Sequence, residues 1–255
     1  MRNRLYIASI AEDAAALAGE YGIGLELDHY CTAVNMEVPN LISVHAQARR
    51  DIEAAGAPGL LFHAPFNELS PGAIDPEINA IAYKRYEQSY RLASEQYQIN
   101  RMIVHSGYMP HVYYKIWHQE RSVEFWNQYM ENKPDTFQIL IENVLEDEPY
   151  MMARLGEALQ RTNIALCLDI GHANCISSIP VKEWIRVMGP FTEHVHIHNN
   201  YGDHDYHNAL ADGSMDMAAV LEDIERYCKK SATITIESLD GRNSLEWLDK
   251  EGYLT

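Results

Sequence analysis

Residues 194–200 are His-Val-His-Ile-His-Asn-Asn, so three histidines alternate with two β-branched residues. A period of two indicates a β-strand, because successive side chains point to opposite faces of a sheet. His194, His196 and His198 therefore share one face, and Val195 and Ile197 share the other. In a barrel, strand side chains alternate between the interior and a surrounding layer of helices. The stretch therefore predicts a barrel strand whose inner face carries polar groups.

Seven further segments have the same short, β-branched character. Together with the first they make eight predicted strands: Leu5–Ile10, Gly24–Asp28, Leu60–Pro65, Met102–Ser106, Gln138–Asn143, Ala165–Ile170, His194–Asn199 and Thr233–Ser238. Helical periodicity lies between them, most clearly in Glu77–Gln98 and Met217–Lys230, and Pro180 and Asp216 are typical of helix starts. Eight strands alternating with about eight helices predict an α/β fold, a (β/α)8 TIM barrel, formed by residues 1–255 as one domain.

The main alternative fold is a doubly wound open sheet. That fold places a glycine-rich, phosphate-binding turn after its first strand. The corresponding turn here, residues 9–13, is Ser-Ile-Ala-Glu-Asp and contains no glycine. The turn therefore favours the barrel.

The composition limits the compartment and the partners of the protein. The chain has 255 residues, with 20 Lys and Arg against 37 Asp and Glu and a net charge of −17 with histidine neutral. Apolar residues make up 47%, which excludes disorder for the bulk of the chain, and no apolar run approaches the roughly 18 residues that span a bilayer. We expect no signal peptide, and the four scattered cysteines fit a reducing environment, so a cytoplasmic protein without membrane contact is expected. The acidity counts against nucleic acid as a partner, because a phosphate backbone requires a basic surface.

Potential metal ligands stand at the ends of six consecutive predicted strands, from the third to the eighth. They are His63, His105, Glu142, Asp169 followed by His172, His196 and Glu237. Active sites of barrels form at the C-terminal ends of the strands, so these side chains should converge on one small mouth. Two carboxylates ~4 Å apart repel each other by roughly 4 kcal/mol at an effective dielectric of about 20. The neighbours within these motifs are histidines, and a cluster of histidines and carboxylates suits Zn, Mn or Fe. The pattern therefore predicts a metal site.

The loop after the seventh predicted strand adds two candidates, Asp205 and His207. The neighbouring register, Asp203 and His204, is the alternative pair in this loop. The loop can also be interpreted as a polar surface turn flanked by glycine.

The remaining histidines have less defined roles. His194 and His198 share a strand face with His196 and are expected to line the pocket. The others have no motif around them and are expected at the surface or in loops: His29, His45, His111 and His118.

The ligand pattern resembles the xylose isomerase-like TIM-barrel superfamily and, within it, the endonuclease IV family. The endonuclease IV pattern has nine ligands in a fixed order, and every type is present here: His63, His105, Glu142, Asp169, His172, His196, Asp205, His207 and Glu237. The motifs that carry the likeness are Asp-x-x-His at 169–172, Ile-His-Asn at 197–199, Asp-x-His at 205–207 and Leu-Ala-Asp-Gly at 210–213. The resemblance implies up to three divalent metal ions, normally zinc, with Mn, Mg, Fe or Co as the other options.

The resemblance also assigns ligands to the three ions. The first ion would bind His63, His105 and Glu142, the second Glu142, Asp169, His196 and Glu237, and the third His172, Asp205 and His207. The implied chemistry is hydrolysis of a phosphoester by metal-activated water. Glu142, Glu237 and His172 are the expected catalytic residues, and Glu142, as the bridging ligand, would also orient the nucleophile.

Two departures from the endonuclease IV family concern the substrate. Members of that family carry basic and aromatic residues on loops that grip DNA, whereas residues 27–37 here contain no Lys or Arg and are acidic. The chain is also somewhat short for that family. The expected partner is therefore a small phosphorylated or sugar substrate, and abasic DNA is an alternative that the acidity disfavours.

Sugar isomerases and epimerases of the same superfamily provide the second interpretation. They resemble this chain at Glu142, Asp169, His196 and Glu237, which would hold one Mn²⁺ or similar ion. His172 would then contact substrate, and the two glutamates would form an acid/base pair that moves a proton beside a carbonyl. This interpretation gives the other four predicted ligands no metal role and expects an arginine in the loop after the seventh strand, where none occurs. A metal-binding barrel without catalysis is the non-enzymatic alternative, and the sequence leaves the oligomeric state open.

Overall fold

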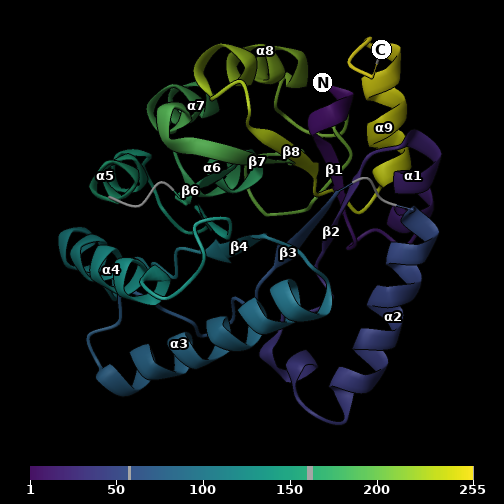
Figure 1. Ribbon diagram of the computed structural model, residues 1–255. Coiled ribbons are helices and arrows are strands. Elements are labelled where there is room, and N and C mark those ends of the chain that lie inside the picture. The colour runs from purple at the N-terminus through teal and green to yellow at the C-terminus, as the bar shows by residue number, and fades with distance from the viewer. Residues whose placement is uncertain (57–58, 160–162, 255) are drawn as a thin grey trace.

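The eight predicted strands form a closed parallel barrel in the computed structural model, which describes residues 1–56, 59–159 and 163–254 (Figure 1). The strands are β1 (Leu5–Ala8), β2 (Gly24–Leu27), β3 (Leu60–His63), β4 (Arg101–His105), β5 (Gln138–Glu142), β6 (Ile164–Asp169), β7 (Thr192–Ile197) and β8 (Thr233–Ile236). Each strand pairs in parallel with its neighbours in sequence, and β1 pairs with β8 to close the ring. The (β/α)8 barrel is confirmed, and the doubly wound sheet is excluded.

The strands end one or two residues before their predicted C-terminal boundaries. The alternation of side chains continues past the last ladder hydrogen bond, so His198 and Glu237 follow β7 and β8 directly. Both residues therefore lie at the rim of the barrel, just beyond the hydrogen-bonded strands.

Helices connect the strands and surround the ring in Figure 1. They are α1 (Ala14–Tyr21), α2 (Asn40–Ala55), α3 (Pro76–Arg91), α4 (Lys115–Met130), α5 (Tyr150–Ala158), α6 (Ile170–Ile176), α7 (Val181–Met188), α8 (Met217–Tyr227) and α9 (Gly241–Lys250). Short 3-10 turns cover Arg2–Arg4, Ala33–Met36 and Gly189–Phe191. Asp216 caps α8 by accepting a hydrogen bond from the backbone N–H of Ala219 (3.2 Å), and Pro180 directly precedes α7, so both predicted helix starts are confirmed.

The long helix predicted over Glu77–Gln98 consists of two parts. α3 ends at Arg91, and Leu92–Gln96 continue it as a π-helical segment before Gln98 adopts a left-handed φ of 55°. The π-helix is rare and mostly occurs as a single turn within or beside an α-helix. In the described part of the chain, no helix combines the length and the apolar character that crossing a bilayer requires.

The barrel interior is built from layers of inward-facing side chains. Leu61, Ile103, Leu140, Ala165 and Cys167 form a buried cluster separate from the core between strands and helices. Inward-facing residues recur at every second position along a strand, so Ala165 and Cys167 occupy two successive inward positions of β6. The inward positions that follow Leu61, Ile103, Leu140 and Cys167 are predicted ligands: His63, His105, Glu142 and Asp169. The predicted ligands therefore lie above the apolar cluster, at the C-terminal end of the barrel.

Replacing Ile103 with alanine should lower the free energy of unfolding by about 2–5 kcal/mol, because it removes buried methyl groups and leaves a cavity. Ile103 is 0% exposed, whereas Ile81 on α3 is 50% exposed. Ile81→Ala removes the same atoms and should change that free energy by less than about 0.5 kcal/mol. Denaturant unfolding measures both values, and equal losses would contradict the interior position of Ile103.

Candidate metal centre

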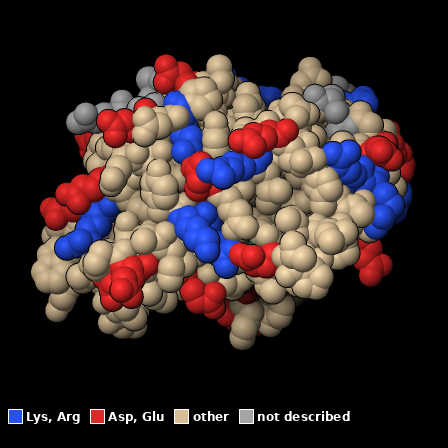
Figure 2. Space-filling model, turned by 60° about the horizontal axis from the view of Figure 1, so that its bottom comes forward, with Lys and Arg blue, Asp and Glu red and all other residues tan. Residues whose placement is uncertain are grey.

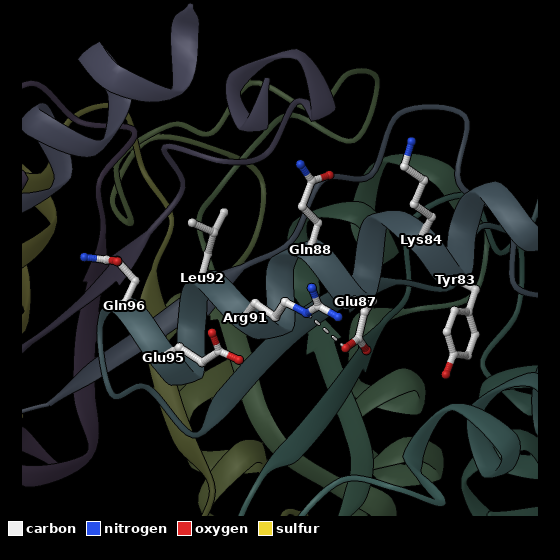
Figure 3. A pocket seen from close by; sticks show the side chains of 8 residues that line it. All are labelled: Tyr83, Lys84, Glu87, Gln88, Arg91, Leu92, Glu95 and Gln96. Carbon is white, nitrogen blue, oxygen red and sulfur yellow. Dashed lines mark hydrogen bonds and ion pairs between the residues drawn. The ribbon is translucent and has the colours of Figure 1, made fainter. Parts of the chain in front are cut away.

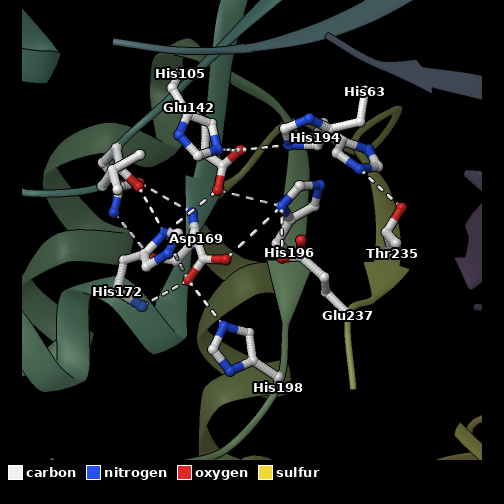
Figure 4. A network of polar contacts seen from close by, with 12 residues as sticks. His63, His105, Glu142, Asp169, His172, His194, His196, His198, Thr235 and Glu237 are labelled. Carbon is white, nitrogen blue, oxygen red and sulfur yellow. Dashed lines mark hydrogen bonds and ion pairs between the residues drawn. The ribbon is translucent and has the colours of Figure 1, made fainter. Parts of the chain in front are cut away.

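All nine predicted ligands lie at the C-terminal mouth of the barrel. Figure 4 shows most of them joined in one network of polar contacts. Among the described residues, donor atoms lie within 4.8 Å of one another in five sets, two of which are Asp28 with Cys31 and His63, and Cys167 with His194 and His196. The other three sets are treated as groups of the centre, and they include every predicted ligand except His172. The groups are His63 with His105 and Glu142, then Glu142 with Asp169, His196 and Glu237, and finally His198 with Asp205 and His207.

The first group joins β3, β4 and β5. Oε2 of Glu142 lies 3.3 Å from Nε2 of His63 and 3.5 Å from Nε2 of His105. Nδ1 of His63 donates a hydrogen bond to the carbonyl of Ala64 (2.9 Å), so Nε2 is the nitrogen that can lose its proton and bind an ion. Phe66 stacks on the ring of His105, with centroids 4.4 Å apart and 8° between the planes. The orientations of both histidines are therefore fixed from outside the group.

The second group uses Glu142 again. Nδ1 of His196 lies 3.4 Å from Oε1 of Glu142, 3.7 Å from Oδ2 of Asp169 and 3.0 Å from Oε2 of Glu237. All four residues are buried, and Glu237, at 7%, is the most exposed. Because Glu142 directs one oxygen to each of the first two groups, it is placed to bridge two ions.

The third group lies beside the second. Nε2 of His207 is 3.0 Å from Oδ2 of Asp205, and Nε2 of His198 is 3.6 Å from Oδ1. His172 contacts the same carboxylate, with its Nε2 3.2 Å from Oδ2. The resemblance assigns His172, Asp205 and His207 to one ion, whereas the donor atoms that lie together in the structure are those of His198, Asp205 and His207.

Backbone pairing holds the loop of the third group. Asn199 and Asn208 exchange two backbone hydrogen bonds of 3.1 and 3.0 Å. His207 adopts a left-handed φ of 50°, and its Nδ1 donates to the carbonyl of Glu237 (2.7 Å). This hydrogen bond leaves Nε2 of His207 directed at Asp205.

The alternative register of this loop lies away from the mouth. Asp203 and His204 are exposed, and they contact each other with 3.5 Å between Oδ2 and Nδ1. The register with Asp205 and His207 is the one that the structure brings to the other ligands.

Asp169 has two roles in the Asp-x-x-His motif. It ends β6 and caps α6, because its Oδ1 accepts a hydrogen bond from the backbone N–H of His172 (2.6 Å). The side chain of Asn143 holds the backbone of Asp169 by donating to its carbonyl and accepting from its N–H, both at 2.9 Å. Nδ1 of His172 donates to the carbonyl of Asn143 (3.0 Å), which leaves Nε2 to face Asp205. The motif thus places a carboxylate and an imidazole through one helix start.

Several donor atoms of the centre are buried and lack a hydrogen bond to any described group. They are Oε1 of Glu142, Oδ2 of Asp169, Oε2 of Glu237, Nδ1 of His196 and both ring nitrogens of His198. Native proteins leave few such atoms, and each costs about 1–3 kcal/mol. Divalent ions would satisfy them together, and a mixed set of imidazoles and carboxylates suits zinc or manganese. The residues present therefore fit a metal centre.

Burial and mutual contacts shift the pKa values of these ligands in the metal-free protein. Burial lowers the pKa of His105 to about 3. Burial also acts to lower the pKa of His207, but the hydrogen bond to Asp205 and the charges of Glu237, Asp205 and Asp169 together outweigh it and raise that pKa to about 9. For Asp169, burial acts to raise the pKa, but the charges of His172 and His198 and the hydrogen bond to His198 together outweigh it, so the pKa falls to about 2. The centre therefore combines protonated histidines with ionised carboxylates, and a binding metal ion must displace protons.

Glu26 is a buried residue near the centre that sequence analysis missed. Its Oε1 lies 3.1 Å from Nε2 of His196, and its Oε2 lies 3.4 Å from Nε2 of His194. Burial acts to raise the pKa of Glu26, but the two histidines hold it well below its usual range. The signal was the alternation Leu25-Glu26-Leu27, which puts the carboxylate on the opposite face from the leucines.

The expectation that His118 lies at the surface or in a loop is wrong. His118 is on α4, is 1% exposed and donates from Nε2 to the carbonyl of Ser106 (3.2 Å). Its ring occupies space that a side chain at Gly72 would fill, since a Cβ there would lie 2.2 Å from Nδ1. His29 and His45 are half-buried, and His111 is exposed in the loop before α4.

A groove of about 480 Å³ lies on the outside of the barrel along α3 (Figure 3). Its lining consists of Tyr83, Lys84, Glu87, Gln88, Arg91, Leu92, Glu95 and Gln96. Arg91 and Glu87 form an ion pair across one turn of the helix (3.4 Å). The groove belongs to the helix layer and contains none of the predicted ligands.

The charged surface in Figure 2 is mixed. On this face Lys and Arg stand between Asp and Glu, and they form no continuous basic area. A nucleic-acid backbone binds along a run of basic groups, so this face provides no track for it.

Comparison with known proteins identifies similar barrels. The TTHB071 protein from Thermus thermophilus, soaked with ZnCl2, is 25% identical, with coverage of 100% of this chain and 99% of that chain and a TM-score of 0.77. A D-tagatose 3-epimerase-like protein is 18% identical over 98% of this chain and 96% of its own, with a TM-score of 0.72. Among curated proteins, Uncharacterized protein MJ1311 from Methanocaldococcus jannaschii is 24% identical over 215 residues, which are 73% of this chain and 67% of that protein.

The activities named among these neighbours belong to sugar epimerases, which agree better with the sugar isomerase interpretation than with phosphoester hydrolysis. At 18% identity or less, however, the likeness concerns the fold. A family model described as xylose isomerase-like TIM barrel matches residues 12–251. The chain therefore belongs to the xylose isomerase-like TIM-barrel family.

Proposed function

We propose that this protein is a metal-dependent hydrolase of a phosphoester, with up to three divalent ions at the mouth of the barrel. The observation that carries the proposal is the position of Glu142 between two donor groups, with a third group beside them. A single-metal site requires only the second group. The three ions would be held by the three groups, with His172 between the second and the third.

The charge and the exposure of the ligands favour an anionic substrate. Divalent ions would supply Lewis-acid stabilisation of phosphoryl oxygens and activation of a water molecule. Three such ions against four carboxylate ligands leave a surplus of two positive charges. The surplus suits a phosphate group.

The exposed fractions of the ligand side chains indicate from which side a substrate would reach the centre. The side chains of Asp205, His207 and His105 are 32%, 22% and 15% exposed, whereas those of His196 and Glu142 are 0% and 1% exposed. A phosphoester would therefore approach over the first and third groups, with the second group beneath it. Glu237, the most exposed of the carboxylates in the second group, is the residue that would accept a proton, and Glu142 would orient the reacting groups.

The surroundings of the mouth favour a small substrate over DNA. The segment 27–37 after β2 contains no Lys or Arg. Lys115, at the start of α4, is engaged in ion pairs with Asp147 and Glu148. Binding of an anion would therefore depend on the metal ions rather than on a basic surface.

Epimerisation of a sugar is the second candidate. The observation that favours it is the second donor group, in which Glu142 and Glu237 both contact Nδ1 of His196 (3.4 and 3.0 Å) and could flank one ion and one substrate. The names of the solved neighbours agree with it. Epimerisation with one ion in the second group would give the residues of the first and third groups no function.

The variant His207→Ala distinguishes the two candidates. The wild-type protein with Zn²⁺ or Mn²⁺ should hydrolyse small phosphoesters, and His207→Ala should lower kcat/KM by at least about 100-fold, because loss of a ligand exceeds the 10- to 100-fold cost of losing an outer partner. His204→Ala, a matched change in the same loop, should retain wild-type activity because His204 is exposed and outside the centre. Phosphate release measures the hydrolysis. Epimerisation of free ketoses that survives His207→Ala, without phosphoester hydrolysis, would refute the hydrolase.

Zinc binding should release protons at about pH 7. In the metal-free protein the pKa of His207 is about 9, so the imidazole is protonated and must lose its proton to bind an ion. Zinc affinity should therefore rise with pH up to about 9, by as much as about tenfold per pH unit for each proton displaced. Calorimetry in two buffers with different ionisation enthalpies measures the number of protons. His207→Ala should release about one proton fewer than His204→Ala, and identical wild-type heats in the two buffers would contradict the expectation.

A further inference from the structure

A column of polar side chains lies inside the barrel below the ligand layer. It runs from Arg101 at the start of β4, through Thr233 and Thr235 on β8 and His194 on β7, to Glu26 on β2. Thr235, His194 and Glu26 are each 0% exposed, at positions where barrels usually carry branched apolar residues. A buried polar network is costly unless each of its groups is matched. The column therefore calls for an explanation of its own.

The hydrogen bonds of the column run in one direction. Arg101 donates to Oγ1 of Thr233 (2.8 Å), and the Thr233 hydroxyl donates to Nδ1 of His194 (2.6 Å). His194 then carries its proton on Nε2, which donates to Oγ1 of Thr235 (3.0 Å). The Thr235 hydroxyl donates to Oε2 of Glu26 (2.5 Å). Because arginine only donates and a carboxylate only accepts, the two ends fix every proton between them.

The column ends behind a metal-binding candidate. Oε1 of Glu26 lies 3.1 Å from Nε2 of His196, while Nδ1 of the same ring faces the carboxylates of the second group. Figure 4 shows His194 joined to Thr235 beside His196. Oε1 of Glu26 and Nε2 of His196 are both buried, and neither has a hydrogen bond to any described group, so their 3.1 Å approach is an ion-pair contact. A carboxylate behind a ligating histidine fixes the tautomer of the ring and strengthens its other nitrogen as a ligand.

We propose that Glu26 is a positioning residue that holds His196 with its proton on Nε2 and so directs Nδ1 to the metal. The inference rests on the proposed function in one respect, that His196 binds an ion. Glu26 itself contacts neither the ion nor the substrate. The column keeps Oε2 of Glu26 occupied by the Thr235 hydroxyl and leaves Oε1 for His196.

A metal ion beneath His196 is the competing explanation. Donor atoms of Cys167, His194 and His196 lie within 4.8 Å of one another. However, both ring nitrogens of His194 are engaged, Nδ1 by the Thr233 hydroxyl and Nε2 by Thr235. His194 therefore has no lone pair left for an ion, and the positioning role explains the same contacts without one.

The test compares Glu26→Gln with Glu53→Gln, a matched change at an exposed glutamate on α2. Competition with a chelator measures the zinc affinity of each protein, and long-range ¹H–¹⁵N NMR of the zinc-loaded proteins reports which nitrogen of His196 carries the proton. Glu26→Gln should weaken the binding of one zinc ion about 10- to 100-fold and change the ring signals of His196, because an amide donates as well as accepts. Glu53→Gln should match the wild type in both measurements.

A second variant keeps the test decisive if Glu26→Gln does not fold. Thermal unfolding of the metal-free proteins checks the fold, and Thr235→Val interrupts the column while it retains the carboxylate. Thr235→Val should weaken the binding of the same zinc ion by about tenfold or less, which is a smaller effect than that of Glu26→Gln.

Three results would overturn the inference. The first is that Glu26→Gln retains wild-type zinc affinity and wild-type His196 signals. The second is a thiolate-to-metal absorption band in the Co²⁺-loaded protein that disappears in Cys167→Ser, which would place an ion beneath His196. The third is a wild-type protein that binds no zinc, which would refute the proposed function as well. A wild-type protein that binds zinc through His196 but hydrolyses no phosphoester would refute the proposed function alone.

Discussion

The burial of one carboxylate, that of Glu142, governs the arrangement of the mouth. Its side chain is 1% exposed, and four histidines from other parts of the barrel lie within 3.5 Å of its oxygens: His63, His105, His172 and His196. An ionised carboxylate in such a place is destabilising by several kcal/mol unless positive charge and hydrogen bonds compensate for it. Burial acts to raise the pKa of Glu142, yet the surrounding histidines hold it well below its usual range. Burial lowers the pKa of His105, whereas the pKa values of His63, His172 and His196 are raised by their contacts with acidic groups. These three histidines supply the compensating charge without metal, and divalent ions would supply it when bound.

The ring nitrogens are controlled by a layer of partners outside the ligands. Backbone carbonyls accept from Nδ1 of His63, His172 and His207, which leaves Nε2 of each ring for the centre. His196 is turned the other way, with Nδ1 toward the centre and Nε2 toward the carboxylate of Glu26. The strands and loops thus determine not only where the imidazoles lie but also which nitrogen each one presents. Outer partners of this kind fix the tautomer and the orientation of the histidines in metal sites.

The eight strands, the barrel and the strand-end ligands could be predicted from sequence because the period of two identifies the inner face of each strand. The period does not give the height of a side chain along the barrel axis, because that height depends on the stagger between neighbouring strands. The sequence therefore did not show that Glu26 lies at the level of His194 and His196. The position of His198 beside the third group depends on the pairing of Asn199 with Asn208, a contact between a strand end and a loop. The burial of His118 depends on a glycine in a different loop, which removes the side chain that would occupy its place. Each of these features is set by contacts between segments, and no local pattern encodes them.

The proposed function requires a multinuclear centre at the mouth of the barrel rather than a single-metal site. Anomalous diffraction at the zinc absorption edge, from crystals grown with Zn²⁺, tests it most directly because it counts and places the ions without reference to a substrate. Three peaks are expected, one beside each donor group, with Glu142 between the first two. A single peak among Glu142, Asp169, His196 and Glu237, with water at the other two groups, would contradict it and would support a single-metal sugar isomerase or epimerase.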